Sequence, residues 1–477
     1  MTIYQNLIAG EWTGADAVEN INPSDTKEVV GLYASGSATD TNNAIAAAKA
    51  AFPAWSRSGI WERHVILKKA GDEIMARKDE LGALLAREEG KTLPEAIGET
   101  IRASQIFEFF AGEALRLAGE VVPSVRPNIG VEITREPLGV IGIITPWNFP
   151  IAIPAWKIAP ALCYGNTIVF KPAELVPGCS WAIVDILNRA GLPKGVLNLV
   201  MGKGSIVGQT MLDSPDLAGI TFTGSVGTGK RVALSSIEHN RKIQLEMGGK
   251  NPMVILDDAD LSVAVEAAAN SAFFSTGQRC TASSRLIVTE GIHDRFVQAM
   301  TEKLKTLNVD HALKTGTHIG PVVDERQLKT DTDYIEIGKK EGAKLAFGGE
   351  LISRDTPGFY LQPTLFTEAT NQMRISREEI FGPVASVIRV KDYEEALAVA
   401  NDTPFGLSSG IATTSLKHAT HFKRNAEAGM VMVNLPTAGV DFHVPFGGRK
   451  ASSYGSREQG KYAAEFFTTV KTAYTLA

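Results

Sequence analysis

Cysteine is scarce in this chain of 477 residues. Only Cys163, Cys179 and Cys280 occur, and no two of them form a CxxC pair. A disulfide framework or a thiolate zinc site requires more cysteines at closer spacing. We therefore expect neither, we expect no metal site, and the composition is typical of a reducing cytoplasm.

Long runs of one residue type are absent as well. The 48 Lys and Arg residues against 53 Asp and Glu give a net charge of -5, so neither nucleic acid nor an anionic membrane is expected as a partner. Residues 1–12 have no basic region before an apolar run, which predicts no secretory signal. The most apolar stretch, 140–170, falls short of the ~20 clean apolar residues of a membrane helix. It is interrupted by Pro146, Asn148, Pro150, Pro154, Lys157 and Pro160.

The chain does contain a regular alternation of short apolar runs and helical periodicity. Residues 44–55 and 63–88 carry apolar side chains at helical spacing. This pattern predicts an α/β fold, with a parallel sheet covered by helices on both faces and ligands at the carboxyl ends of its strands. The predicted strands lie at 139–145, 166–170, 196–200 and 218–222, and further helices at 156–164 and 179–190.

A second sheet is predicted after Gly248, with strands at 252–256, 284–289, 366–368 and 384–390. Because the chain is longer than one hydrophobic core usually serves, we expect at least two domains. The segments 130–137 and 468–476 are strand-like and remote from the main alternation. They either pair as edge strands in a subunit interface or form ordinary surface hairpins.

A glycine-rich turn, Phe222 to Lys230, follows a predicted strand and opens a predicted helix. Its backbone N–H groups could hold a phosphate at the positive end of the helix, although glycines also serve plain turns. The spacing satisfies G-x-x-x-x-G-K, which keeps a P-loop hydrolase as an alternative. Arg231 stands where that motif needs the magnesium-binding Ser or Thr, which counts against it.

Two other strand ends carry polar side chains. Lys171 and Glu174 follow the strand that begins near 166 and could hydrogen-bond to ribose hydroxyls; alternatively they are exposed charges before a helix. Asn148 stands between Trp147 and Phe149, flanked by two prolines. Its amide is either a fixed donor for a developing negative charge or the cap of a turn.

Cys280 differs from the other two cysteines because Arg279 precedes it in Gly277-Gln278-Arg279-Cys280-Thr281. A neighbouring cation lowers the pKa of a thiol, so Cys280 is a candidate nucleophile. Cys163 and Cys179 lie in apolar surroundings typical of packing. Glu246, before Gly248 and Gly249, is either a general base or a strand-end carboxylate.

In this order the motifs resemble those of the aldehyde dehydrogenase superfamily, from Leu7-Ile8-Ala9-Gly10-Glu11-Trp12 to Phe467-Thr468-Thr469-Val470-Lys471. Glu379 to Val384 and Pro445 to Gly448 add to the resemblance. It implies a Rossmann-type dinucleotide-binding domain (1–118 and 139–247), a catalytic α/β domain (248–449) and a small β oligomerisation arm (119–138 and 463–477). It also implies a homodimer or homotetramer.

The resemblance assigns roles to single residues. Cys280 is the nucleophile, Asn148 with the backbone N–H of Cys280 forms the oxyanion hole, and Glu246 activates water. The cofactor, NAD or NADP, is expected to contact Lys171 and Glu174 at the adenosine ribose, Gly224 and Ser225 near the pyrophosphate, Trp147 near the adenosine half, Glu379 at the nicotinamide ribose and Phe381 at the nicotinamide. Lys157 and Glu458 match positions linked to proton relay.

Within the superfamily, Glu88 to Ala96 and Ser456 to Gly460 resemble bacterial α-ketoglutarate semialdehyde (2,5-dioxopentanoate) dehydrogenases. That substrate is acidic, and we expect Arg279 to bind its carboxylate. An otherwise apolar funnel is expected from Phe149, Ile153, Trp156 and Phe274, which keeps a broad-specificity aldehyde dehydrogenase as an alternative. Glu174 would repel the 2′-phosphate of NADP, yet similar semialdehyde enzymes often accept NADP. A catalytically silent structural protein is disfavoured because Cys280, Glu246 and Asn148 are all present.

Overall fold

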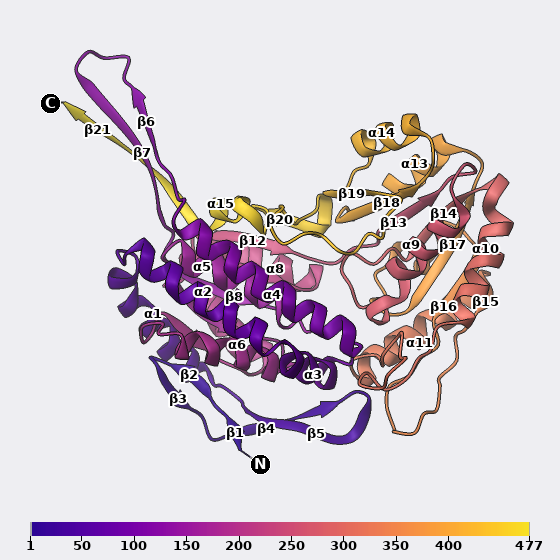
Figure 1. Cartoon of the computed structure of the whole chain (residues 1–477), viewed down its shortest axis with the longest axis horizontal. Helices are drawn as coiled ribbons and strands as arrows, with labels where there is room; N and C mark the ends of the chain where they lie inside the picture. Colours follow the sequence, from indigo (N-terminus) through magenta and orange to yellow (C-terminus); the bar gives the residue numbers. More distant parts are fainter. Residues whose placement is uncertain (1, 477) are drawn as a thin grey trace.

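Two large sheets, each covered by helices, and two smaller sheets make up the computed structural model, which describes residues 2–476 (Figure 1). The first large sheet has the strand order β20-β12-β11-β8-β9-β10-β2-β3. Its five central strands, from β12 to β10, are parallel, as the alternation predicts. The strands are β2 (Asn6–Ile8), β3 (Glu11–Thr13), β8 (Val140–Ile144), β9 (Thr167–Lys171), β10 (Leu197–Leu199), β11 (Gly219–Thr223), β12 (Lys242–Glu246) and β20 (Ser453–Gly455).

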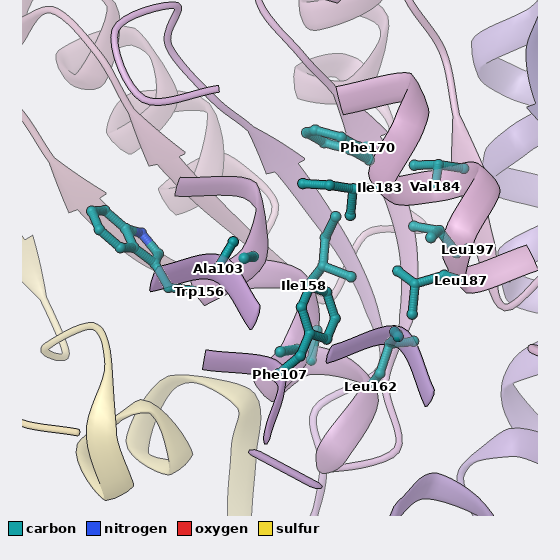
Figure 2. Packing of buried hydrophobic residues seen from close by; sticks show 14 of the residues in the cluster. Ala103, Phe107, Trp156, Ile158, Leu162, Phe170, Ile183, Val184, Leu187 and Leu197 are labelled. Carbon is teal, nitrogen blue, oxygen red and sulfur yellow. The ribbon is translucent and has the colours of Figure 1, made fainter. Parts of the chain in front are cut away.

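Side chains of the central strands enter two different cores, because successive residues of a strand point to opposite faces. Ile168 and Phe170 of β9 join one core and Val169 joins the other. Figure 2 shows part of the first core, where side chains of α4 (Leu93–Ala114), α5 (Ala152–Cys163) and α6 (Pro177–Arg189) form one cluster with Phe170 of β9 and Leu197 of β10. The helices next to this sheet are α1 (Ala38–Trp55), α5 (Ala152–Cys163), α6 (Pro177–Arg189), α7 (Gln209–Asp213) and α8 (Val226–Glu238).

A further layer of helices packs over α5 and α6: α2 (Ile60–Ala76), α3 (Lys78–Glu89) and α4 (Leu93–Ala114). The single helix predicted over 63–88 is wrong, because the chain breaks at Arg77, whose φ of -103° and ψ of 16° are not helical. The Arg77 side chain bridges the two helices by donating to Glu73 of α2 and Glu80 of α3.

The second large sheet has the order β15-β16-β17-β14-β13-β18-β19 and is parallel except for β15. Its strands are β13 (Pro252–Ile255), β14 (Arg285–Thr289), β15 (Lys344–Phe347), β16 (Thr364–Ala369), β17 (Val384–Val390), β18 (Ser408–Ala412) and β19 (Met430–Val433). Its helices are α9 (Leu261–Phe273), α10 (Glu290–Lys305), α11 (Glu325–Lys340), α12 (Arg374–Arg377), α13 (Tyr393–Asn401) and α14 (Leu416–Asn425). Four of these strands match predicted ones; β15, β18 and β19 were not predicted.

The smaller sheets lie at the edges of the molecule. One has the order β1-β5-β4, from β1 (Ile3–Tyr4), β4 (Ala17–Asn22) and β5 (Asp25–Ala34). The other projects from the body as an arm, with the order β21-β7-β6 (Figure 1). It comprises β6 (Glu120–Pro123), β7 (Ile129–Pro137) and β21 (Thr468–Leu476), which follows α15 (Ala464–Phe467). The segments 130–137 and 468–476 do pair with each other, in a register from Thr468↔Pro137 to Leu476↔Ile129, and their place in a subunit interface stays a prediction.

The expected domain ranges stay predictions, although the two large sheets fall on either side of Gly248 apart from β20, which returns to the first sheet by pairing with β12. Within residues 2–476, no helix combines the length and the apolar character that crossing a membrane requires.

Arg285 of β14 is completely buried and has no carboxylate within ion-pair distance among the described residues. Its guanidinium donates to the carbonyls of Lys250, Val399 and Ala400 and to Asn371 Oδ1, at 2.9–3.0 Å. Val399 and Ala400 lie in the last turn of α13, whose carbonyls carry partial negative charge and favour a cation.

We expect Arg285→Met to lower the free energy of unfolding by about 3 kcal/mol or more, because it leaves several buried acceptors without a donor. Arg389→Met, on the paired strand β17, is the matched control, since Arg389 makes only surface ion pairs worth about 1 kcal/mol or less. Thermal unfolding midpoints of the two variants check this. Equal midpoints would contradict the role given to Arg285.

Candidate active site

Cys280 lies where two cavities meet. It lines a cavity of about 450 Å³ bounded by α4, α5 and residues 436–446, and a second of about 290 Å³ at the carboxyl ends of β8, β11 and β12. Cys163 and Cys179 are buried, as their surroundings predict. Of the three thiols, only Cys280 can therefore meet molecules that enter from either side.

The turn that precedes Cys280 has an unusual backbone. Ser275, Thr276 and Gly277 all have positive φ, at 50°, 58° and 66°, which is strained for the first two. Glu95 of α4 holds this turn, because its Oε1 accepts from both the N–H and the Oγ of Ser275. A side chain at Gly277 would place Cβ 2.3 Å from the carbonyl of Gly382.

The expectation that Phe274 lines the funnel is wrong. The large cavity is lined by Phe149, Ile153, Trp156 and Arg279 as expected, but Ser275 takes the place of Phe274. The positive-φ turn is the reason, since it redirects the chain directly after Phe274, the last residue before the turn. Phe446, which stacks on Trp156 with ring centroids 5.3 Å apart, completes the aromatic wall and was not predicted.

Asn148 follows β8, is buried, and lines the smaller cavity together with Cys280. Its Nδ2 donates to the carbonyl of Gln278 at 2.9 Å, which fixes the amide and leaves its second N–H available. The backbone carbonyl of Asn148 accepts a hydrogen bond from Lys91 Nζ at 2.7 Å. Lys91 is therefore a positioning residue that sequence reasoning missed.

Glu246 ends β12 but lines neither cavity. Its carboxyl group accepts a hydrogen bond from Ser453 of β20, and a side chain at Gly447 would place Cβ 2.6 Å from its Oε1. Burial, and then the charge of Glu458, raise the pKa of Glu246 well above its ordinary value. Ser453 was not predicted, and to reach water beside Cys280 the Glu246 side chain must turn away from it.

Contrary to expectation, Arg279 does not bring the pKa of Cys280 below its ordinary value, although the charges of the two groups do act on each other. Arg279 Nη2 is instead paired with Glu95 at 3.0 Å. Burial, followed by the charges of Glu246 and Glu379, raises the pKa of the Cys280 thiol to about 12. The protein without a ligand therefore keeps this thiol protonated at neutral pH.

The smaller cavity collects the residues expected near a dinucleotide: Trp147, Gly224, Ser225, Glu379 and Phe381. Ser225 caps the N-terminus of α8 by accepting from the N–H of Thr228, and this positive end of the helix lies at the smaller cavity. Glu379 accepts from the N–H of Gly249 at 2.8 Å, and a side chain at Gly248 would collide with it at 2.0 Å. Trp147 meets Phe381 edge to face, with centroids 5.3 Å apart.

The expected ribose residues lie at the end of β9. Lys171 is buried and donates to the carbonyl of Pro172 at 2.9 Å. Glu174 accepts from the N–H of Gly204, the first residue of the π-helical turn Gly204–Gly208, at 2.7 Å. Glu174 and Lys203 also line a cavity of about 80 Å³. Lys203 was not predicted, and nothing in its local pattern marks it.

The structure brings Lys157 and Glu458 together as an ion pair with both side chains buried. Lys157 Nζ also donates to Thr221 Oγ1 at 2.7 Å, and Thr221 donates to Gln244 Oε1 at 2.9 Å. Because Glu458 acts on the pKa of Glu246, this network is electrostatically connected to Glu246.

A parallel sheet with a helix N-terminus at one cavity, and an accessible thiol shared between that cavity and a second one, is the arrangement expected of an α/β enzyme that binds a dinucleotide. Residues 12–473 match the model of the aldehyde dehydrogenase family, and the chain belongs to that family. The expected fold and enzyme class are thereby confirmed.

Two curated relatives align over nearly the whole chain. The chain is 45% identical to alpha-ketoglutaric semialdehyde dehydrogenase of Bacillus subtilis, covering 99% of this chain and 98% of that one. It is 42% identical to 2,5-dioxopentanoate dehydrogenase of Saccharolobus solfataricus, covering 99% of both chains.

Solved structures are similar throughout as well. Betaine aldehyde dehydrogenase from Staphylococcus aureus in complex with NAD+ superposes with a TM-score of 0.97 at 34% identity, over 99% of this chain and 95% of that one. An E. coli NADP-dependent enzyme superposes with a TM-score of 0.96 at 35% identity, over 99% and 98%.

We expect Glu246→Gln to lower the pKa of the Cys280 thiol. Two carboxylates, Glu246 and Glu379, disfavour the thiolate, and Glu246 has the larger effect on its pKa. Since iodoacetamide reacts with the thiolate, the labelling rate of the variant should begin its rise at lower pH. Glu174→Gln, a carboxylate at the other end of the cofactor region, is the control and should leave the profile in place. A pH profile unmoved by Glu246→Gln would contradict this electrostatic account.

Proposed function

We propose that the protein oxidises α-ketoglutarate semialdehyde to 2-oxoglutarate, with NAD+ or NADP+ as oxidant. The observation that carries the proposal is the position of Cys280, which lines both the large cavity, where an aldehyde would lie, and the smaller one, where a cofactor would lie; Ile153 also lines both but has no nucleophilic group. The names of the two curated relatives support this substrate, and the aromatic walls of the large cavity keep a broader range of aldehydes as the second candidate.

The residues of the smaller cavity fit a dinucleotide. The N-terminus of α8 suits a pyrophosphate, Glu379 suits ribose hydroxyls, and Gly248 leaves room that any side chain would fill. Such a cofactor supplies the acceptor for the hydride that leaves the aldehyde carbon. Glu174 disfavours a 2′-phosphate while Lys203 beside it favours one, which is consistent with use of both cofactors.

In the first half-reaction the Cys280 thiol loses its proton to solvent, and the thiolate sulfur adds to the aldehyde carbon while the carbonyl electron pair moves onto oxygen. We assign Asn148 Nδ2 and the N–H of Cys280 as donors to that oxyanion. When the C=O bond forms again and the hydrogen leaves as hydride, the acyl group remains on sulfur as a thioester.

In the second half-reaction Glu246 takes a proton from water, whose oxygen attacks the thioester carbon. The C–S bond breaks, the acid leaves, and the thiolate is restored. The charges of the buried pair Lys157–Glu458 act on Glu246. We propose that this pair carries the proton away from Glu246.

Two measurements test this function. Cys280→Ala should reduce turnover by at least about 1,000-fold, because no other side chain can form the thioester. The wild type should reduce cofactor faster with α-ketoglutarate semialdehyde than with neutral aliphatic or aromatic aldehydes, tested with NAD+ and NADP+ in parallel. Equal kcat/KM across the panel would favour the broad-specificity candidate, and undiminished turnover by Cys280→Ala would refute the mechanism.

We also propose a cytoplasmic protein, since all three cysteines are free, and a homodimer or homotetramer assembled through the arm. Alternate residues of a strand point to the same face of a sheet. On the arm, one of the two faces carries several exposed apolar side chains. On β21 this face carries Val470, Tyr474 and Leu476, which are 57%, 61% and 74% exposed. Their pairing partners on β7 are Arg135, Val131 and Ile129.

We expect the double variant Val470→Lys/Tyr474→Lys to sediment as a smaller species than the wild type, because it places charges in the proposed interface. Ala473→Lys/Thr475→Lys, on the opposite face of the same strand, is the control. Sedimentation velocity at several concentrations distinguishes them. If both double variants retain the wild-type mass, the apolar face is not the interface.

A further inference from the structure

Five ionisable side chains surround the large cavity beside Cys280: Lys91, Glu95, Glu99, Arg102 and Arg279. Four of them form two closed pairs. Lys91 Nζ lies 2.6 Å from Glu99 with both side chains 1% exposed, and Arg279 lies 3.0 Å from Glu95. The charges of these pairs cancel, so the wall keeps the single positive charge of Arg102.

Arg102 has no carboxylate within ion-pair distance in the part of the chain that the structure describes. One guanidinium nitrogen donates to the amide oxygen of Gln459 at 3.1 Å, and Nε is sealed from solvent without a partner. The guanidinium carbon lies 5.8 Å from the centre of the Trp156 ring. A guanidinium that lines a cavity without a carboxylate partner favours an oxygen anion from elsewhere.

The position of Arg102 follows from α4. Glu95, Gly98, Glu99 and Arg102 recur at helical spacing and line the cavity from one face of this helix. Gly98 leaves space beside Arg102, since a Cβ there would meet nothing within 4 Å. The carboxylates that act on Arg102 over longer distance are Glu99, already paired with Lys91, and the exposed Asp441.

Resting on the function proposed above, we propose that Arg102, rather than Arg279, binds the carboxylate of the aldehyde substrate and selects acidic aldehydes. The aldehyde carbon lies at Cys280 and the carboxylate at Arg102, both within one cavity. Binding balances the one uncompensated charge of the wall. Arg279 is a positioning residue, because its guanidinium joins Glu95 and the end of α9 at Asn270.

The test compares wild type, Arg102→Met, Arg102→Gln and Arg102→Lys on α-ketoglutarate semialdehyde and on pentanal, a neutral aldehyde with the same number of carbons. We expect the ratio of the two kcat/KM values to fall about 10- to 100-fold in Arg102→Met and Arg102→Gln, mainly through KM for the acidic aldehyde. Arg102→Lys keeps the charge and should retain most of the ratio. The inhibition constant of 2-oxoglutarate should rise in parallel.

Cofactor binding and the thermal midpoint of each variant report whether it is folded. If Arg102→Met is not folded, Arg102→Gln and Arg102→Lys are compared with the wild type instead. A wild type that does not prefer the acidic aldehyde overturns the proposed substrate. A wild type that prefers it, with variants that lose both substrates equally, overturns the role of Arg102 while the proposed function stands.

Discussion

The carboxylate of Glu95 fixes the position of the turn before Cys280 relative to α4. It accepts from the N–H and the hydroxyl of Ser275 and from Arg279, and so connects α4 to the turn that carries Cys280. Since α4 packs with the first sheet and the turn leads into the second, this one group sets how the thiol faces the cavity between them. Two of the three hydrogen bonds to this oxygen come from Ser275 and help to hold its left-handed conformation, while Thr276 is held by its own hydrogen bond to the carbonyl of Gly320.

Burial explains both the control of the thiol and the arrangement of charges around it. Charged groups removed from water must be paired or must change protonation state. Lys91–Glu99, Arg279–Glu95 and Lys157–Glu458 follow the first course. Cys280, Glu246 and Glu379 follow the second, with their pKa values raised. The site without a cofactor is therefore chemically quiet, and a positive ligand charge near Cys280 would favour the reactive thiolate.

Much of this architecture could be predicted from the sequence, and the exceptions have physical causes. The parallel strands β8 and β9 are almost continuous apolar runs, and every residue of β9, β10 and β11 is buried, so their pattern is strong. The break between α2 and α3 at Arg77 could not be seen in the sequence, because apolar residues keep their helical spacing across it. The positive φ values of Ser275 and Thr276 could not be predicted, because neither residue is a glycine. The hydrogen bonds that hold Ser275 go to Glu95, 180 positions away in the sequence. The sequence also could not show that Arg279 is paired with Glu95, or that burial outweighs any charge near Cys280, because both depend on tertiary packing. Arg102 could have been found from its spacing with Glu95 and Glu99, but only tertiary packing shows that its charge is unpaired.

The return of the chain to its first sheet has a consequence for biosynthesis. β20 pairs with β12, and its Ser453 holds Glu246, while β21 pairs along the whole of β7. Both partners precede these strands by more than 200 residues of sequence, which on a ribosome is many seconds of elongation at ~5–20 residues per second. During that interval the edge of β12 and one edge of β7 are unpaired, and such edges can pair with other chains. The nascent chain therefore passes through a period of exposure to aggregation that ends only when its last strands emerge.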